Sequence, residues 1–181
     1  MDTVTRNQKG IEPLRPYLAK IDSIQNKEDL QEYLTEMQQY GGAGFFGFTV
    51  RSDAKDSNAN AAYIYPAGLG LPDRDYYVAE DSDSKVIKEN YEAHITRMLQ
   101  YLGDSKEDAA KNAKTILAFE TSLARPQLDK VQRRDARITY NPMSVAQLQN
   151  QVKAINWQDY LDEIGAGDVD TLIISQPKYM Q

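Results

Sequence analysis

The chain contains no cysteine, so it can form neither a disulfide bond nor a thiolate nucleophile or metal ligand. It also lacks a run of about 18 apolar residues, and we predict no membrane-spanning segment. Met1 is followed by Asp2 instead of a basic and then an apolar stretch, so no secretion signal is expected here. Basic residues are fewer than acidic ones: 21 Lys and Arg against 27 Asp and Glu give a net charge of −6. This acidic balance disfavours nucleic acid and anionic membranes as partners.

Histidine is almost absent as well, because His94 is the only one. A helical zinc-binding motif needs a glutamate directly after its first histidine and a second histidine four residues on. Ile95 and Met98 occupy those positions, so we expect His94 to be a surface or packed residue of a helix. The chain has neither a Gly-x-Ser-x-Gly nucleophile motif nor a glycine-rich phosphate loop with its lysine. We therefore predict no catalytic, cofactor-binding or metal-binding residue in this chain.

The remaining composition is that of a globular domain. Hydrophobic residues make up 41% and charged residues 27% of the 181 residues. A chain of this length can bury about 70% of its unfolded surface. We expect residues 1–181 to form a single domain.

Apolar residues recur at intervals of three and four over most of the chain, which predicts a mainly α fold. We expect an orthogonal helical domain of five or six helices, bounded by capping residues, glycine or proline, over residues 13–24, 26–40, 84–102, 105–125, 144–152 and 156–164. Residues 127–134 are expected to resume the fourth of these helices beyond Pro126, and residues 133–137 to form a charged linker.

The pattern changes in two places. Short aromatic and β-branched runs at 45–51 and 61–65 predict a small β-hairpin (about 45–65), and a similar run predicts a short strand near 171–175. The polar residues 52–60 are expected to form the solvated tip of the hairpin. A calcium loop is the alternative for Asp53, Asp56 and their neighbours, although the central Gly and terminal Glu of that pattern are absent.

The stretch from Tyr65 to Tyr77 stands at the centre of this arrangement. Its prolines and glycines exclude a regular helix or central strand, while its leucines and tyrosines are too apolar for a solvated turn. We interpret it as an ordered, packed connection in which Asp73 caps a short helical turn. Asp73, Arg74 and Asp75 could instead form a functional carboxylate–guanidinium cluster, but ion pairs at helix starts are common and favour the structural interpretation.

The apolar faces of these elements predict a core. It should contain Leu30, Leu34, Met37, Phe46, Phe48, Ile64, Leu69, Leu71, Tyr91, Ile95, Leu99, Ile116, Leu117, Leu123, Leu148, Trp157 and Leu161. The chain has 12 tyrosines and 4 phenylalanines, so tyrosine either fills the core or forms a surface that a partner covers.

Five segments, in order along the chain, resemble one protein family. They are the opening Met1-Asp-Thr-Val-Thr-Arg-Asn-Gln-Lys-Gly-Ile-Glu-Pro-Leu14, then Gly68-Leu-Gly-Leu-Pro-Asp-Arg-Asp-Tyr-Tyr77, Tyr140-Asn-Pro-Met-Ser-Val-Ala-Gln-Leu148, Ile155-Asn-Trp-Gln-Asp-Tyr-Leu161 and Leu172-Ile-Ile-Ser-Gln-Pro-Lys-Tyr179. Together they are similar to the neprilysin and endothelin-converting-enzyme family of zinc metallopeptidases. The absence of cysteine points to a bacterial-type member, because animal members are rich in disulfides.

The resemblance implies that the chain is a fragment of a zinc metalloendopeptidase. In that family the zinc ligands and the glutamate base follow the matched segments, and the substrate-binding arginines precede them, so no catalytic or metal residue carries over. The fragment then belongs to the helical lid that encloses the substrate cavity and limits substrate size. Zinc would be held outside this chain, the partners would be peptide substrates and the missing catalytic domain, and the parent enzyme would be extracytoplasmic, in the periplasm or at the cell surface.

Two other functions are left open by the residues. The chain can be a stand-alone peptide- or partner-binding helical module without catalysis, or a structural helical domain whose motif matches are coincidental. A His-Glu-x-x-His motif beyond these residues in the natural reading frame would favour the peptidase. If the chain is a lid fragment, we expect it to expose apolar or aromatic surface that the rest of the enzyme covers.

Overall fold

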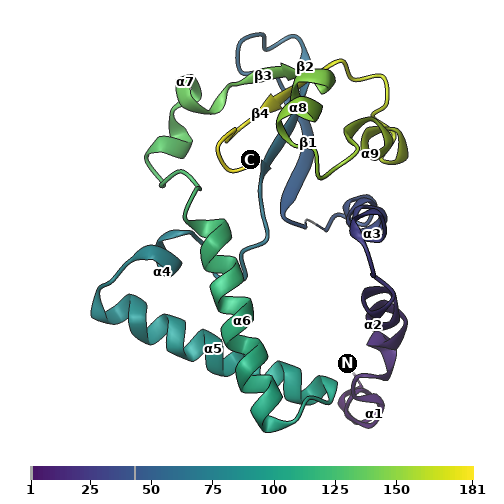
Figure 1. Cartoon of the computed structure of the whole chain (residues 1–181), viewed down its shortest axis with the longest axis vertical. Coiled ribbons are helices and arrows are strands. Elements are labelled where there is room, and N and C mark those ends of the chain that lie inside the picture. Colours follow the sequence, from purple (N-terminus) through teal and green to yellow (C-terminus); the bar gives the residue numbers. More distant parts are fainter. Residues whose placement is uncertain (1, 43) are drawn as a thin grey trace.

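The computed structural model describes residues 2–42 and 44–181. A small sheet with two short helices, α8 and α9, forms one end of the molecule, at the top of Figure 1. A pair of long helices, α5 and α6, extends away from it on one side, and an arm of shorter helices, α1 to α3, descends on the other. The predicted mainly α fold with a small sheet is confirmed.

The N-terminal arm contains more helices than the sequence pattern predicts. Its segments are α1 (Thr3–Lys9), the 3-10 turn η1 (Glu12–Leu14), α2 (Arg15–Asp22) and α3 (Lys27–Gln39). The expected helix over residues 13–24 is therefore divided into η1 and α2, and α1 was not predicted. Asn26 caps α3 as expected, its side-chain oxygen accepting from the Asp29 N–H at 2.8 Å.

Four strands form the sheet, in the order β1-β2-β4-β3. They are β1 (Phe46–Ser52), β2 (Asn60–Pro66), β3 (Pro142–Ser144) and β4 (Thr171–Ile174). The antiparallel β1–β2 hairpin and the β4 strand confirm the sequence prediction. The pattern did not indicate that β4 pairs in parallel with β2, with Ile64 opposite Ile174, or that β3 exists.

The helical pair consists of α5 (Ser82–Leu102) and α6 (Lys106–Ala124), preceded by the single turn α4 (Asp75–Val78). Asp81, and not Asp83 or Ser84, begins α5, because its carboxylate accepts from the Ser84 N–H at 2.9 Å. Ala109 and Ala113 of α6 have no exposed surface, so small side chains permit the close approach of the two helices. The helix α6 ends at Ala124, as Pro126 predicts.

The prediction of a helix over residues 127–134 is wrong. Only the 3-10 turn η2 (Gln132–Arg134) forms there, because the Leu128 N–H donates to the side-chain oxygen of Gln176 at 2.7 Å instead of to a preceding helical carbonyl. The expected charged linker contains another single turn, α7 (Ala136–Thr139). The helices α8 (Val145–Gln151) and α9 (Trp157–Glu163) follow, begun by Ser144 and Asn156 as predicted.

Most of the buried side chains lie at the sheet end. Helices α8 and α9 pack on the sheet, and the ring of Phe46 lies 5.1 Å from that of Trp157 and 5.3 Å from that of Tyr160. Of the predicted core residues, seven are buried, which confirms the prediction for them. The other ten are only half-buried. The confirmed residues are Leu34, Phe46, Ile64, Ile95, Leu148, Trp157 and Leu161. The tyrosines are divided: Tyr63, Tyr77 and Tyr160 are buried, whereas Tyr17, Tyr40, Tyr65 and Tyr101 are exposed.

Candidate functional site

The connection between β2 and α5 lies where the sheet end meets the helical pair. It begins at Gly68, which has a φ of +83°, and a Cβ there would lie 3.1 Å from the carbonyl oxygen of Gly44. The Ala67 N–H donates to the Phe45 carbonyl at 2.9 Å, and the Tyr179 hydroxyl lies between the carbonyls of Phe45 and Ala67, donating to one at a time. We call residues 68–77, together with Glu120 and Arg133, the junction.

Glu120 of α6 accepts three hydrogen bonds inside the junction. The Tyr77 hydroxyl donates to its Oε2 at 2.5 Å, the Tyr91 hydroxyl to its Oε1 at 3.0 Å and the Gly70 N–H to its Oε2 at 3.3 Å. The Tyr77 hydroxyl in turn accepts from the Leu71 N–H at 2.8 Å. One carboxylate thus fixes the connection to both long helices. The sequence analysis did not predict these contacts, because Tyr77 and Tyr91 lie 43 and 29 residues from Glu120 along the chain.

The electrostatics keep both hydroxyls protonated. Burial, followed by the negative charge of Glu120, raises the pKa of Tyr91 to about 12. Burial, followed by the hydrogen bond to Glu120, raises the pKa of Tyr77 further above its ordinary value. A phenol with a raised pKa is a hydrogen-bond donor at neutral pH and not a base or nucleophile. This cluster therefore holds the backbone of the junction through hydrogen bonds.

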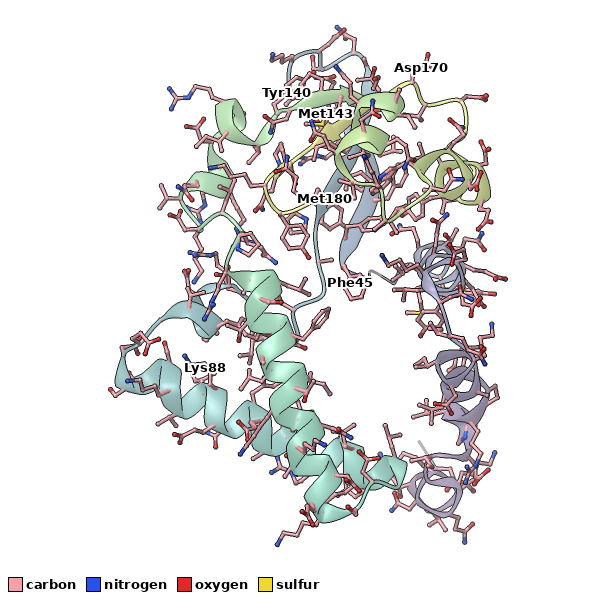
Figure 2. The ribbon with its side chains drawn as sticks, viewed as in Figure 1. Phe45, Lys88, Tyr140, Met143, Asp170 and Met180 are labelled. Atoms are coloured by element: carbon pink, nitrogen blue, oxygen red, sulfur yellow. The ribbon has the colours of Figure 1, made fainter. Side chains whose placement is uncertain are left out.

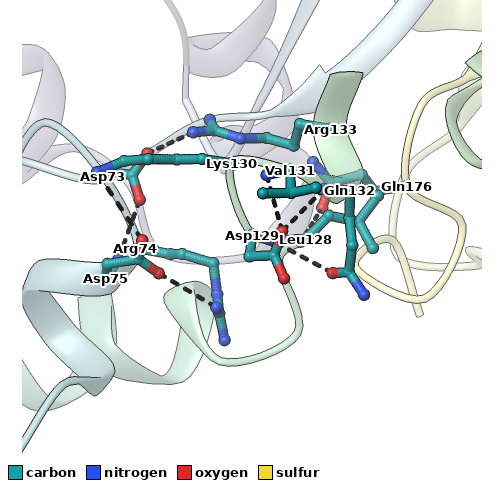
Figure 3. Close-up of polar contacts among 10 residues, drawn as sticks. All are labelled: Asp73, Arg74, Asp75, Leu128, Asp129, Lys130, Val131, Gln132, Arg133 and Gln176. Carbon is teal, nitrogen blue, oxygen red and sulfur yellow. Dashed lines mark hydrogen bonds and ion pairs between the residues drawn. The ribbon is translucent and has the colours of Figure 1, made fainter. Parts of the chain in front are cut away.

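Asp73 is the second anchor of the junction, and Figure 3 shows its contacts. Its carboxylate is 7% exposed, accepts from the Asp75 N–H at 3.1 Å and pairs with the guanidinium of Arg133. Burial alone would raise the pKa of Asp73, but the Asp75 N–H and the Arg133 charge outweigh burial and lower it. The predicted hydrogen bond from the Asp75 N–H is present, although Arg74 and not Asp73 occupies the N-cap position of α4. The ion pair was missed because its two residues lie far apart in the sequence.

The charged neighbours of this pair belong to the same contact. Arg74 Nη1 lies 3.3 Å from Asp75 Oδ1, and Lys130 Nζ lies 3.8 Å from Asp75 Oδ2. Arg74 and Asp75 thus pair with each other, whereas Asp73 pairs with Arg133. All three residues take part in ion pairs, which favours the structural interpretation of the cluster, although Nε of Arg74 is buried without a hydrogen-bond partner.

The other candidates from the sequence lie apart from the junction. His94 is exposed on α5, next to the buried Ile95. Asp53 accepts from the Lys55 N–H at 2.7 Å and from the Tyr140 hydroxyl at 3.0 Å, and Asp56 accepts from the Asn58 N–H at 3.0 Å. The carboxylates of the hairpin tip thus serve the tip's own turns and its contact with Tyr140, which Figure 2 labels.

The described residues were compared with two kinds of functional feature, a metal site and a membrane-spanning helix. Within residues 2–42 and 44–181, no three His, Cys, Asp or Glu side chains gather in a way that could hold a metal ion. In the same described residues, no helix combines the length and the apolar character needed to cross a bilayer.

Comparisons with known proteins give one consistent result. The sequence pattern of peptidase family M13 matches residues 1–181. Mouse endothelin-converting enzyme 1 is 33% identical over 170 residues, which is 87% of this chain and 22% of that enzyme. The structure is similar to the zinc metalloprotease Zmp1 of Mycobacterium tuberculosis in complex with an inhibitor, with a TM-score of 0.87 and 36% identity over 96% of this chain and 27% of that one. The open state of Zmp1 gives a TM-score of 0.88 at 35% identity over 99% and 28% of the two chains.

Proposed function

Because this chain belongs to peptidase family M13, the family of the endothelin-converting enzymes, we propose that it forms part of the helical lid of a zinc metalloendopeptidase. The chain spans about a fifth of the curated relatives that it matches (22%), so the activity belongs to a longer polypeptide in this proposal. The lid encloses the substrate cavity and limits the size of the peptides that enter. Residues 1–181 act as one domain of that lid, through shape and packing.

One observation carries the proposal. Almost the whole chain overlays about a quarter of Zmp1, a zinc metalloprotease whose structures include an open and a partially open state. An enzyme that opens and closes needs a rigid body to move and a firm joint within it. The junction supplies such a joint, because Glu120 and Asp73 fix the connection to α5, α6 and η2 with buried or half-buried contacts.

The residues of this chain do not fit the zinc ion of such an enzyme. His94 stands alone and exposed, and the described residues contain no cluster of three metal ligands. In the proposal, zinc and the catalytic groups therefore lie in the rest of the polypeptide, and peptides are its substrates. We also propose an extracytoplasmic, bacterial-type parent enzyme, on the family resemblance and the absence of cysteine.

The test uses the full-length enzyme with Gly70→Ala and Pro72→Ala combined. A Cβ on Gly70 would lie 1.8 Å from the Tyr91 hydroxyl, so the variant must displace Tyr91 from Glu120. We expect the ratio of cleavage rates for a short and a long peptide to change, while zinc stoichiometry stays the same. Adding Tyr91→Phe removes the nearest clashing atom and should restore part of the original ratio. Loss of zinc from a variant that remains folded would contradict the proposal.

A further inference from the structure

An apolar groove lies where four parts of the chain meet. The four parts are α3, the start of β1, α6 and the segment between α8 and α9. Met180 also lines the groove, which has a volume of about 350 Å³. Leu30, Leu34, Phe45, Phe119, Leu123 and Trp157 line it. The polar groups at its edge belong to Lys27 and Tyr179, and the Tyr179 hydroxyl is already bonded to backbone carbonyls. Figure 2 labels Phe45, at the lower end of β1 in that view, and Met180, which lies higher beside the strands.

Phe119 is the most unusual residue of the groove. It lies on α6 with half of its surface exposed (50%), and its ring meets that of Phe45 edge-on at 5.6 Å. Exposing a large ring beside other apolar side chains is unfavourable, since each exposed Å² of apolar surface costs about 25 cal/mol. An exposed ring at an apolar groove is therefore a favourable contact for an apolar side chain of another segment.

The N-terminal arm gives a second, independent sign of a missing partner. Leu14, Tyr17, Leu18 and Ile21 recur at intervals of three and four residues; Leu18 is half-buried, whereas Leu14, Tyr17 and Ile21 are 50%, 63% and 46% exposed. Among the described residues of α1, η1 and α2, none is buried. In Figure 1 the arm and α6 run on opposite sides of the region below the sheet, and no helix or strand of the described chain lies between them.

We propose that this groove is the docking site of a helix of the same polypeptide from outside residues 1–181, inserting apolar side chains between α3 and α6. The inference rests on the proposed function, in which this chain is part of a longer enzyme. Residues 1–181 overlay only 27–28% of the solved Zmp1 chains, so about three-quarters of that polypeptide lies outside the matched part.

The chemistry of the groove selects a helix over an extended peptide. An extended segment brings backbone N–H and C=O groups that need hydrogen-bond partners, and a buried group without one is costly. The groove offers almost no free polar group, whereas a helix satisfies its own backbone and presents apolar side chains at intervals of three and four. The volume of about 350 Å³ is at the low end for small-molecule sites, which suits a few inserted side chains.

The experiment measures thiol accessibility in the full-length protein. Phe119→Cys is compared with Val86→Cys, a matched control on α5 that is 53% exposed and outside the groove. Maleimide labelling is followed at each site by peptide mass spectrometry. We expect the thiol at position 119 to react at least about tenfold more slowly than the control, because it is protected by packing. A benzophenone side chain at position 119 should cross-link to a segment of the same molecule beyond residues 1–181.

Each outcome decides the inference. Protection that persists on dilution and without added peptide supports it. Labelling of Phe119→Cys as fast as Val86→Cys overturns it, as does protection that appears only with bound peptide or is lost on dilution. Peptide cleavage by the same preparations tests the proposed function separately. If the enzyme is active but the thiol is unprotected, the groove inference is wrong and the proposed function stands. If the thiol is protected but the protein cleaves no peptide, the groove inference stands and the proposed function is wrong.

Discussion

Trp157, Leu161 and Ile174 at the sheet end have no exposed surface, whereas Leu14, Tyr17 and Ile21 of the N-terminal arm remain about half exposed. Both regions carry the apolar periodicity of packed elements, but only the sheet end finds its partners within residues 2–42 and 44–181. The sheet end therefore contributes a buried core, and the arm contributes an exposed apolar surface. The comparison teaches that the same apolar periodicity leads to a core only where other elements of the chain pack against it.

The largest effect is expected in the core of the sheet end. Trp157→Ala removes a ring that packs on Phe46 and Tyr160 and whose Nε1–H donates to the Val152 carbonyl at 3.0 Å. The free energy of unfolding should fall by about 3–5 kcal/mol. Tyr101→Ala, at an aromatic residue that is 66% exposed, is the control and should change little. Equal losses in denaturant melts would remove the distinction between core and surface.

The junction should respond less than the core. Glu120→Gln leaves the hydroxyls of Tyr77 and Tyr91 facing a neutral amide, and we expect a loss of about 1–3 kcal/mol. Glu107→Gln, at an exposed position of the same helix, is the control.

The pH dependence of the junction follows from the tyrosines. The pKa of Tyr91 is raised to about 12 in the folded chain, above its ordinary value of 10.0, so folding favours the protonated phenol. This contribution is fully present below pH 10 and is lost as the pH rises through about 12. Tyr91→Phe should therefore reduce the slope of stability against pH over this interval in alkaline unfolding. An unchanged slope would show that folding does not raise the pKa of Tyr91.

The Asp73–Arg133 pair should contribute less still. Its carboxylate is buried, but the Arg133 side chain is 40% exposed, so water screens the attraction. A double-mutant cycle with Asp73→Asn and Arg133→Met should give a coupling energy of about 1 kcal/mol or less. The pKa of Asp73 is lowered below its ordinary value of 3.8, so its contribution is present above that pH and is lost as the pH falls through the lower value of the folded chain. Coupling that persists after protonation of Asp73 would contradict the pairing.

The smallest effect is expected on the arm. Ile21→Ala in the isolated chain should cost less than about 0.5 kcal/mol, because the side chain is already half exposed. In the full-length enzyme the same substitution should cost about 1 kcal/mol or more if another segment covers this face. Melting both proteins with and without the substitution measures the difference, and equal costs would show that the arm has no partner.

Local signals allowed much of the fold to be predicted. The caps at Asn26, Ser105, Ser144 and Asn156 depend on side chains two or three residues from the amides that they bind, so the sequence displays them directly. The same holds for Asp73, whose hydrogen bond with the Asp75 N–H was predicted.

The errors came from contacts between distant residues. The parallel pairing of β2 with β4 joins residues more than a hundred positions apart, and Gln176 diverts Leu128 from a helix in the same way. In the candidate site, the local hydrogen bond between Asp73 and Asp75 was predicted, but the partners of Glu120 and Arg133 were missed because they lie far away in the sequence. The absence of catalytic residues from this chain stays a prediction, because it rests on catalytic motifs that the sequence lacks and on the family resemblance.

The parallel β2–β4 pairing also sets an order of events during synthesis. The hairpin β1–β2 is complete once Pro66 has left the ribosome, but the edge of β2 that pairs with β4 stays open until Ile174 emerges. At typical rates of translation this interval lasts about 5–20 s. An open strand edge with the apolar residues Ala62 and Ile64 can associate with other chains during this time. The open edge of β2 is therefore exposed to aggregation until β4 is made, and chaperone binding to the hairpin should protect it during this interval.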